Sequence, residues 1–228
     1  IDRDNKYNDK EDNKNYESEK TQRNINLPNF LVIGASRSGT TWLYEILKSH
    51  PNIYMPEDKK ELDFFNIHFN KGLIWYSSFF PSKNNKEYKA IGEVTPRYLY
   101  EEEVAKRVKK SLSKDIKFIV ILRNPSNRLY SSYKKKMNER FFTMSYEDYV
   151  NKYERAVSRG FYYKHLSMWF KHFPKDKFLI LFYEDLKKDP YKEVMKISKF
   201  LKVDNEGFEK KVINGKYNSS EDHSLKLL

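Results

Sequence analysis

The sequence predicts an α/β fold in which a central parallel β-sheet carries helices on both faces. Two observations lead to this class. Continuous apolar runs at residues 30–33 and 178–182, and within residues 117–122, are typical of strands that are buried on both faces. Segments with the spacing of helices separate these runs, and parallel strands need such crossover connections. The 228 residues suit one domain of this kind, and no internal repeat is visible.

The first elements are expected to form a strand, a turn and a helix. The apolar run at residues 30–33 stops at Gly34, which predicts a short buried strand. Over residues 40–50 the apolar side chains share one helical face, and Pro51 ends the pattern. The other elements expected in this half are a short strand at 53–55, an aromatic-rich helix at 72–80, a strand at 88–91 and a charged helix at 101–112.

The second half continues the alternation. Residues 117–122, with the sequence KFIVIL, are the clearest buried strand. Asp189 and Pro190 match the N-cap and first position of a helix that should run to Leu201. The other elements expected here are two or three helices between residues 126 and 173, one of them capped by Ser145 and Asp148, and a strand at 178–182.

Composition divides the chain in two. Residues 1–26 hold six basic and seven acidic side chains and almost no apolar ones, which predicts a disordered tail or linker. The whole chain has a net charge of +12, so the predicted domain at residues 27–228 carries +13. Such a charge favours anionic ligands, although a solvated lysine-rich surface would also explain it. An apolar pattern that starts at Leu225 suggests that the domain is truncated at its C-terminus.

The absence of cysteine excludes several classes of site. A disulfide scaffold, a thiolate zinc site and a cysteine nucleophile all require this residue. A cysteine-free chain slightly favours a reducing compartment such as the cytoplasm, and the Golgi lumen stays open if an N-terminal anchor has been removed. No apolar run reaches the roughly 20 residues that a membrane span needs.

A glycine-containing turn follows the first strand and opens the first helix. Its two glycines, Gly34 and Gly39, have the G-x4-G spacing of a phosphate loop, which predicts a P-loop-like domain rather than an ordinary turn. The lysine that a nucleoside-triphosphate loop needs after its second glycine is absent, and Arg37 is the one cation in the loop. The expected anion-binding residues are Ser36, Arg37, Ser38, Gly39, Thr40 and Thr41.

A second candidate phosphate site follows the strand at 117–122. Arg123 leaves the carboxyl end of this strand, where open α/β sheets bind their ligands, and its guanidinium can hold two phosphate oxygens at once. Ser131 lies about two turns along the next helix and can add a hydroxyl. The alternative for Arg123 is a surface salt bridge, and for Arg128 in the same segment that alternative is favoured.

These two segments resemble the phosphate motifs of the sulfotransferase superfamily, most closely those of heparan-sulfate-type and bacterial carbohydrate sulfotransferases. The resemblance covers about residues 28–228. It implies that the loop at 34–41 binds the 5′-phosphosulfate of 3′-phosphoadenosine 5′-phosphosulfate (PAPS), and that Arg123 and Ser131 contact the 3′-phosphate. It also implies that the product is 3′-phosphoadenosine 5′-phosphate (PAP). Asn124 stands where the family often has Asp.

The resemblance further implies where the reaction takes place. Transfer of a sulfuryl group to an alcohol needs a base for the acceptor proton and a cation at the departing oxygen. Glu61, in Lys59-Lys60-Glu61-Leu62-Asp63-Phe64-Phe65, matches the family's catalytic Glu, and the two aromatic residues are expected to shield it. Arg37 is the expected catalytic cation. Asp63 occupies a position that is often His in the family.

A stretch at residues 92–98 resembles the substrate-side segment of the same branch. Its candidate substrate contacts are Glu93 and Arg97, with Asp63 as a third. The family's lysine is Val94 here, so Arg37 carries its role alone, or Arg97 or a neighbouring Lys helps. Lys216 after Gly215 resembles the family's C-terminal loop over the 3′-phosphate, which makes it a further donor-binding candidate.

The acceptor, and functions other than sulfuryl transfer, can also be considered from the sequence. The predicted acceptor is a glycan or another hydroxylated, possibly anionic molecule, while a small alcohol or a peptide tyrosine would need the same chemistry. A P-loop nucleotide kinase is disfavoured because the loop lacks its lysine. A nucleic-acid-binding module would explain the charge but not two phosphate sites at strand ends. We expect no nucleic-acid partner and no metal requirement.

Overall fold

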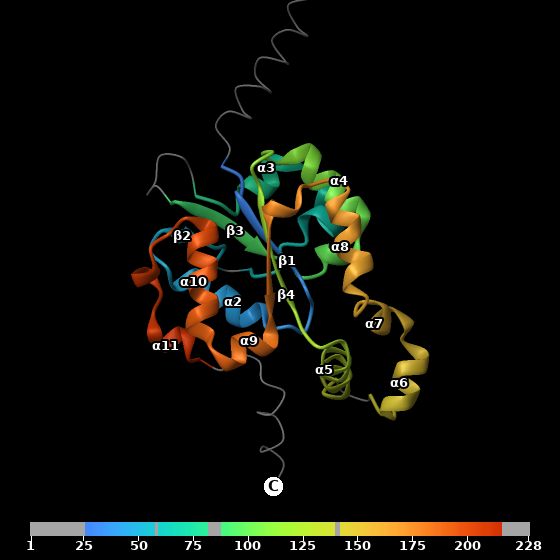
Figure 1. Ribbon diagram of the computed structural model, residues 1–228. Helices are drawn as coiled ribbons and strands as arrows, with labels where there is room; N and C mark the ends of the chain where they lie inside the picture. The colour runs from blue at the N-terminus through green and yellow to red at the C-terminus, as the bar shows by residue number, and fades with distance from the viewer. Residues whose placement is uncertain (1–25, 58, 82–87, 140–141, 216–228) are drawn as a thin grey trace, which may run out of the picture.

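The central feature of the computed structural model is a sheet of five parallel strands (Figure 1). The structure describes residues 26–57, 59–81, 88–139 and 142–215, so the predicted tail at 1–26 lies almost wholly outside the described residues. The strands run in the order β2-β3-β1-β4-β5, and all the pairings between neighbours are parallel. Their bounds are β1 (Phe30–Gly34), β2 (Ile53–Tyr54), β3 (Ala90–Val94), β4 (Lys117–Leu122) and β5 (Phe178–Phe182). The predicted α/β class is thereby confirmed.

Helices cover both faces of the sheet (Figure 1). On one face α2 and α10 pack against Val32, Ile119 and Ile121; on the other, α4 and α8 pack against Leu31 and Phe118. The helices are α2 (Thr40–Ser49), α3 (Gly72–Ser77), α4 (Glu102–Ser111), α5 (Pro125–Met137), α6 (Tyr146–Lys152), α7 (Glu154–Ser158), α8 (Tyr162–Phe170), α9 (Tyr183–Lys188), α10 (Pro190–Leu201) and α11 (Lys210–Ile213).

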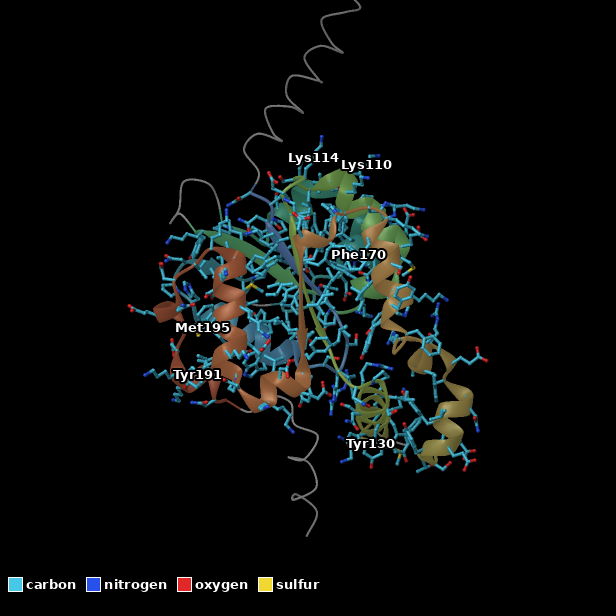
Figure 2. All side chains as sticks on the ribbon, in the orientation of Figure 1. Lys110, Lys114, Tyr130, Phe170, Tyr191 and Met195 are labelled. Atoms are coloured by element: carbon cyan, nitrogen blue, oxygen red, sulfur yellow. The ribbon has the colours of Figure 1, made fainter. Side chains whose placement is uncertain are left out.

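β4 explains why the predicted strands read as continuous apolar runs. Phe118 and Val120 belong to the core on one face, while Ile119 and Ile121 belong to the core on the other. Successive side chains of a strand point to opposite faces, so a strand buried on both faces needs no polar alternation. Figure 2 shows side chains filling the space between sheet and helices, whereas Lys110 and Lys114 project outward at the end of α4.

Helix starts follow the capping signals in the sequence. The Asp189 side chain accepts a hydrogen bond from the backbone N–H of Lys192 at 3.0 Å, and Ser145 accepts one from Asp148 N–H at 3.1 Å. Both contacts satisfy backbone donors that the first helical turn leaves unpaired. In the part of the chain that the structure describes, no helix is long and apolar enough to span a bilayer.

The strand predicted at residues 88–91 is shifted toward the C-terminus. β3 begins at Ala90 and continues through Glu93 and Val94, so part of the candidate substrate segment is strand. Gly92 is paired with Phe30 of β1, and a Cβ atom at this position would lie 2.3 Å from Cζ of the Phe30 ring. The missing side chain makes room for that ring, and sequence periodicity does not reveal such a contact.

The order of the strands places a crevice between β1 and β4. The chain leaves β1 toward β2 and β3 on one side of the sheet, and β4 and β5 lie on the other side of β1. The connections from these two strands therefore diverge, and in open α/β sheets ligands bind at such a point, outside the carboxyl ends of the strands. The loop after β1 and Arg123 after β4 both lie at that edge.

Candidate active site between β1 and β4

The loop from β1 to α2 forms one side of the crevice. Arg37 and Gly39 adopt left-handed backbone angles, with φ of 71° and 89°. Glycine suits this conformation, and a Cβ at Gly39 would lie 3.1 Å from the Tyr183 ring. The turn leads directly into Thr40 at the start of α2, whose N-terminal N–H groups carry partial positive charge. The predicted strand, turn and helix are therefore present, with the loop at a helix N-terminus.

Hydrogen bonds join this loop to the segment after β4. Nε of Arg37 donates to Oγ of Ser131 at 3.2 Å, and Nη1 of Arg123 donates to the carbonyl oxygen of Arg37 at 3.1 Å. The guanidinium of Arg123 also lies 4.4 Å from the centre of the Tyr183 ring. The two segments predicted to bind phosphate therefore meet, and the basic residues of both face the same crevice.

The electrostatics of the crevice suit an anion. Burial lowers the pKa of Arg37 from its usual value, and the neighbouring charge of Arg123 lowers it further. Two guanidinium groups this close repel each other, and a bound anion would relieve that repulsion. In addition, Nε of Arg123 is buried and has no hydrogen-bond partner among the described residues. The basic groups therefore have capacity for negatively charged oxygens.

A cavity of about 340 Å³ lies beside Arg123. Leu122 and Phe182, at the ends of β4 and β5, line it together with Tyr162 and Glu184. An apolar wall with a few polar groups is typical of sites for small molecules, and the volume is in their usual range of about 300–1,000 Å³. This space can take a flat, partly polar ring system next to the phosphate site.

Glu61 lies close to the phosphate loop through its neighbour Lys60. Nζ of Lys60 donates to Oγ1 of Thr41 at 2.8 Å and lies 3.7 Å from Oε1 of Glu61. The Glu61 side chain is 39% exposed, so an acceptor molecule can reach it. No sequence motif predicted that Lys60 would contact this loop. Its position directly before Glu61 was the one feature that pointed to it. The structure thus brings a carboxylate and an amino group to the first turn of α2.

The two aromatic residues after Glu61 do not have the predicted shielding role. Phe64 and Phe65 are fully buried in the hydrophobic core, and Phe64 stacks on Tyr76 with ring centres 4.2 Å apart. Phe65 donates its backbone N–H to the Tyr98 hydroxyl at 3.2 Å. Phe64 and Phe65 therefore anchor the segment after Glu61 in the core and do not cover the Glu61 carboxyl group. Two large apolar rings are stabilised more by burial in the core than by packing at the surface.

Asp63 and Arg97, both expected on the substrate side, form an ion pair with each other. Asp63 is nearly buried and has a left-handed backbone with φ of 52°, whereas the Arg97 side chain is 42% exposed. Asn66 donates a further hydrogen bond to Asp63 at 3.2 Å. The outer part of Arg97 can still meet a substrate, while Asp63 is occupied by its partners.

Glu93, the third residue expected on the substrate side, has no exposed surface. Its carboxyl group accepts hydrogen bonds from the hydroxyls of Tyr76 at 2.6 Å, Thr95 at 2.7 Å and Tyr98 at 3.0 Å. Burial raises the pKa of Glu93 to about 7, although these hydrogen bonds partly oppose the shift. The hydroxyls of Thr95 and Tyr98 also accept hydrogen bonds from the backbone N–H groups of Asp63 and Phe65. Glu93 therefore helps to hold the segment that carries Glu61, through these two hydroxyls.

Other candidates lie away from the reacting groups. Val94 is buried at the end of β3, and Arg128 is buried and donates to the carbonyl of Ala156, so the surface salt bridge expected for it is wrong. The Arg128 guanidinium supplies a hydrogen-bond partner for the buried carbonyl of Ala156, as buried polar groups need. His165 is nearly buried against Tyr100 and contacts the carbonyl of Ser158, which makes it a histidine of the core.

Lys216, the candidate donor-binding residue near the C-terminus, lies outside the described residues. The last described helix, α11, is attached to the phosphate-loop helix because Nε1 of Trp42 donates to the carbonyl of Ile213 at 3.0 Å. Over the described ranges, no group of three or more His, Asp or Glu side chains is arranged to hold a metal ion.

Comparison with known proteins assigns a family to this arrangement. A family model described as "Sulfotransferase domain" matches residues 27–221. The human protein "Bifunctional heparan sulfate N-deacetylase/N-sulfotransferase 3" is 33% identical over 196 residues, which cover 78% of this chain and 22% of the human protein. The chain therefore spans about a fifth of the length of that relative.

Two solved structures have a similar fold. The sulfotransferase from Alicyclobacillus acidocaldarius matches with a TM-score of 0.73 and 24% identity, over 88% of this chain and 90% of the bacterial chain. Mouse sulfotransferase SULT7A1, solved in complex with PAP, matches with a TM-score of 0.58 and 22% identity, over 82% of this chain and 62% of the mouse chain. At these identities the two structures support the fold.

Proposed function

This chain belongs to the sulfotransferase domain family, and on that premise we propose that it transfers a sulfuryl group from PAPS to a hydroxyl or amine of a carbohydrate-type acceptor. The observation that carries the proposal is the hydrogen bond between Arg37 and Ser131. It joins a loop suited to a 5′-phosphosulfate to a strand end suited to a 3′-phosphate. A donor with anionic groups at both ribose positions needs two such sites at one edge of the sheet.

The donor site is formed by the two connections at the crevice. Arg37 and the backbone N–H groups of residues 36–41 would hold the 5′-phosphosulfate, as helix N-termini hold phosphate. Arg123 and Ser131 would hold the 3′-phosphate, for which the buried, unpartnered Nε of Arg123 is available. The cavity beside Arg123 has room for the adenine ring. The mouse sulfotransferase of similar fold was solved in complex with PAP, which supports a nucleotide ligand of this kind.

The residues near Glu61 fit the chemistry of transfer. The acceptor oxygen or nitrogen forms a bond to sulfur while the bond breaks between sulfur and the oxygen that bridges it to the 5′-phosphorus, and PAP leaves with that oxygen. Glu61 would take the proton of the acceptor, a contribution worth about 10²- to 10⁴-fold in rate. Arg37 and the loop N–H groups would stabilise the charge that develops on the bridging oxygen. Glu61 is accessible, and Lys60 connects it to the loop.

The charge of the domain favours an anionic glycan as acceptor. The domain carries +13, and the exposed Lys59, the partly exposed Arg97 and the exposed Lys135 lie in the segments around Glu61 and Ser131. Positive charge near a site raises the local concentration of anionic substrates. The human relative is described as acting on heparan sulfate, which is such a glycan. We therefore propose a glycosaminoglycan-like acceptor.

An acceptor screen with labelled PAPS tests the proposed function. The protein is incubated with desulfated heparan sulfate, with a neutral oligosaccharide, with a phenol and with a tyrosine peptide. We expect label to appear on the desulfated glycosaminoglycan. Label on the phenol or the peptide alone would contradict the acceptor class and leave the donor intact. Magnesium-dependent ATP turnover without any sulfate transfer would contradict the proposal as a whole.

A further inference from the structure

We propose that Lys60 is, in addition to Arg37, a second cationic ligand of the donor's 5′-phosphosulfate. The inference rests on the proposed function and adds a residue that no motif in the sequence assigns. Lys60 lies in the connection after β2, whereas the other donor ligands belong to the connections after β1 and β4. A third segment of the chain would thus complete the donor site.

The position of the Lys60 amino group is fixed by two contacts. Nζ donates to Oγ1 of Thr41 at 2.8 Å, and it lies 3.7 Å from Oε1 of Glu61. Thr41 is the second residue of α2, so the amino group sits at the first turn of the phosphate-loop helix. The Lys60 side chain is only 23% exposed, whereas the adjacent Lys59 is exposed. Lys60 is therefore directed toward the loop rather than toward solvent.

The charges around Lys60 call for an anion. A cation at the N-terminus of a helix is unfavourable, because the helix dipole is positive at that end. Burial lowers the pKa of Lys60, and repulsion from Lys135 on α5 lowers it further, while Glu61 and, to a smaller extent, Glu45 oppose the shift. Glu61 is the one carboxylate that forms an ion pair with Lys60 in the described part of the chain. A bound phosphosulfate would supply the missing negative charge.

The place of Lys60 also suits the transition state. The Arg37 side chain, which belongs to the loop, contacts Ser131, whereas the amino group of Lys60 lies beside Glu61. Negative charge builds up on the bridging oxygen as the sulfur–oxygen bond breaks. Cations held in position before the reaction stabilise such charge without reorganisation. Lys60 would therefore act between the donor oxygen and the base that receives the acceptor proton.

The experiment separates the 5′ end of the nucleotide from the 3′ end. Isothermal titration calorimetry measures the binding of PAP and of adenosine 3′-monophosphate, which lacks the 5′-phosphate, to wild type, Lys60→Met and Lys60→Gln. We expect both variants to bind PAP about 10- to 100-fold more weakly, as for loss of a charge-assisted hydrogen bond. Their affinity for adenosine 3′-monophosphate should be that of the wild type. Lys59→Met, which removes an exposed neighbouring charge, should change neither affinity.

The outcomes distinguish this inference from the proposed function. If wild type does not bind PAP, the proposed function fails, and the inference fails with it. If wild type binds PAP and both Lys60 variants bind it equally well, the inference alone is overturned. An equal loss of affinity for both nucleotides would also overturn it, because a residue that only supports the fold would weaken both. Lys60→Arg, which keeps the charge, should retain most of the PAP affinity.

Discussion

Arg37 and Ser131, 94 positions apart in the sequence, are joined by a hydrogen bond of 3.2 Å between Nε and Oγ. The bond bridges the crevice between the loop after β1 and the helix after β4. Arg123 strengthens this bridge, because it donates to the carbonyl of Arg37 at 3.1 Å. Each motif alone would hold one phosphate group. We propose that, joined in this way, they form one site for a nucleotide that carries anionic groups at both ends of its ribose.

Arg123→Ala tests the assignment of the 3′-phosphate. We expect the variant to lose its preference for PAP over AMP, because charge-assisted hydrogen bonds of this kind contribute about 1.5–3 kcal/mol each. Calorimetric titration with both nucleotides measures the effect. Arg155→Ala is the control, because Arg155 is exposed on α7 and lies outside the crevice. A variant that still prefers PAP to the wild-type degree would show that Arg123 does not contact the 3′-phosphate.

Glu61→Gln tests the proposed base. The amide keeps the size and polarity of the side chain but cannot accept the acceptor proton. We expect the transfer rate at saturating substrate to fall by about 10²- to 10⁴-fold while PAP affinity stays nearly unchanged. Glu57→Gln, an exposed carboxylate in the same connection, should retain activity. Near-normal turnover in Glu61→Gln would place the base elsewhere, and loss of PAP binding would assign Glu61 a structural role.

Removal of metal ions tests the expectation that transfer needs none. A phosphosulfate carries less charge than a triphosphate, and the loop lacks the lysine with which nucleoside-triphosphate loops hold the β- and γ-phosphates. We therefore expect the transfer rate to stay the same after dialysis against EDTA. The measurement is a PAPS transfer assay with and without added magnesium. Activity that is lost in EDTA and restored by magnesium would refute this expectation.

Glu93→Gln tests the buried carboxyl group beneath the Glu61 segment. Because burial raises the pKa of Glu93 from 4.5 to about 7, the folded protein holds its proton more tightly than the unfolded chain. The contribution of Glu93 to stability is therefore present below about pH 4.5 and is lost as the pH rises toward 7. Gln has no such dependence.

Urea unfolding of wild type and Glu93→Gln at several pH values measures this difference. We expect the free energy of unfolding of wild type to fall relative to that of the variant between pH 4.5 and 7, and the difference to stay constant above pH 8. Glu147→Gln, at an exposed carboxylate of α6, should follow the wild type. A constant difference across the whole range would show that folding does not change the pKa of Glu93.

Much of the fold, and the meeting of the two candidate phosphate segments, could be predicted from the sequence because the signals are local. The apolar run at 117–122, the cap at Asp189 and the G-x4-G spacing each act within a few residues. The carboxyl ends of parallel strands share one edge of the sheet, so the rules of α/β folds predict that Arg37 and Arg123 lie near one another. The contact between Arg37 and Ser131 agrees with that expectation.

The substrate side was harder to predict because its contacts are long-range. Asp63 and Arg97 pair across 34 positions, and Glu93 meets Tyr76 beneath them. A sequence shows the charge of these residues but not whether each meets a substrate or another side chain. Lys60 was missed for the same reason, since its contact with Thr41 depends on how the connection after β2 folds over α2.

The most direct test of the account is the relative affinity of the wild-type protein for PAP and AMP, measured by calorimetry. We propose that the loop after β1 and the end of β4 form one site, which binds the 5′ and the 3′ groups of the donor together. We therefore expect PAP to bind at least about 10-fold more tightly than AMP, because Arg123 and Ser131 add contacts to the 3′-phosphate. Equal affinity for the two nucleotides would contradict it.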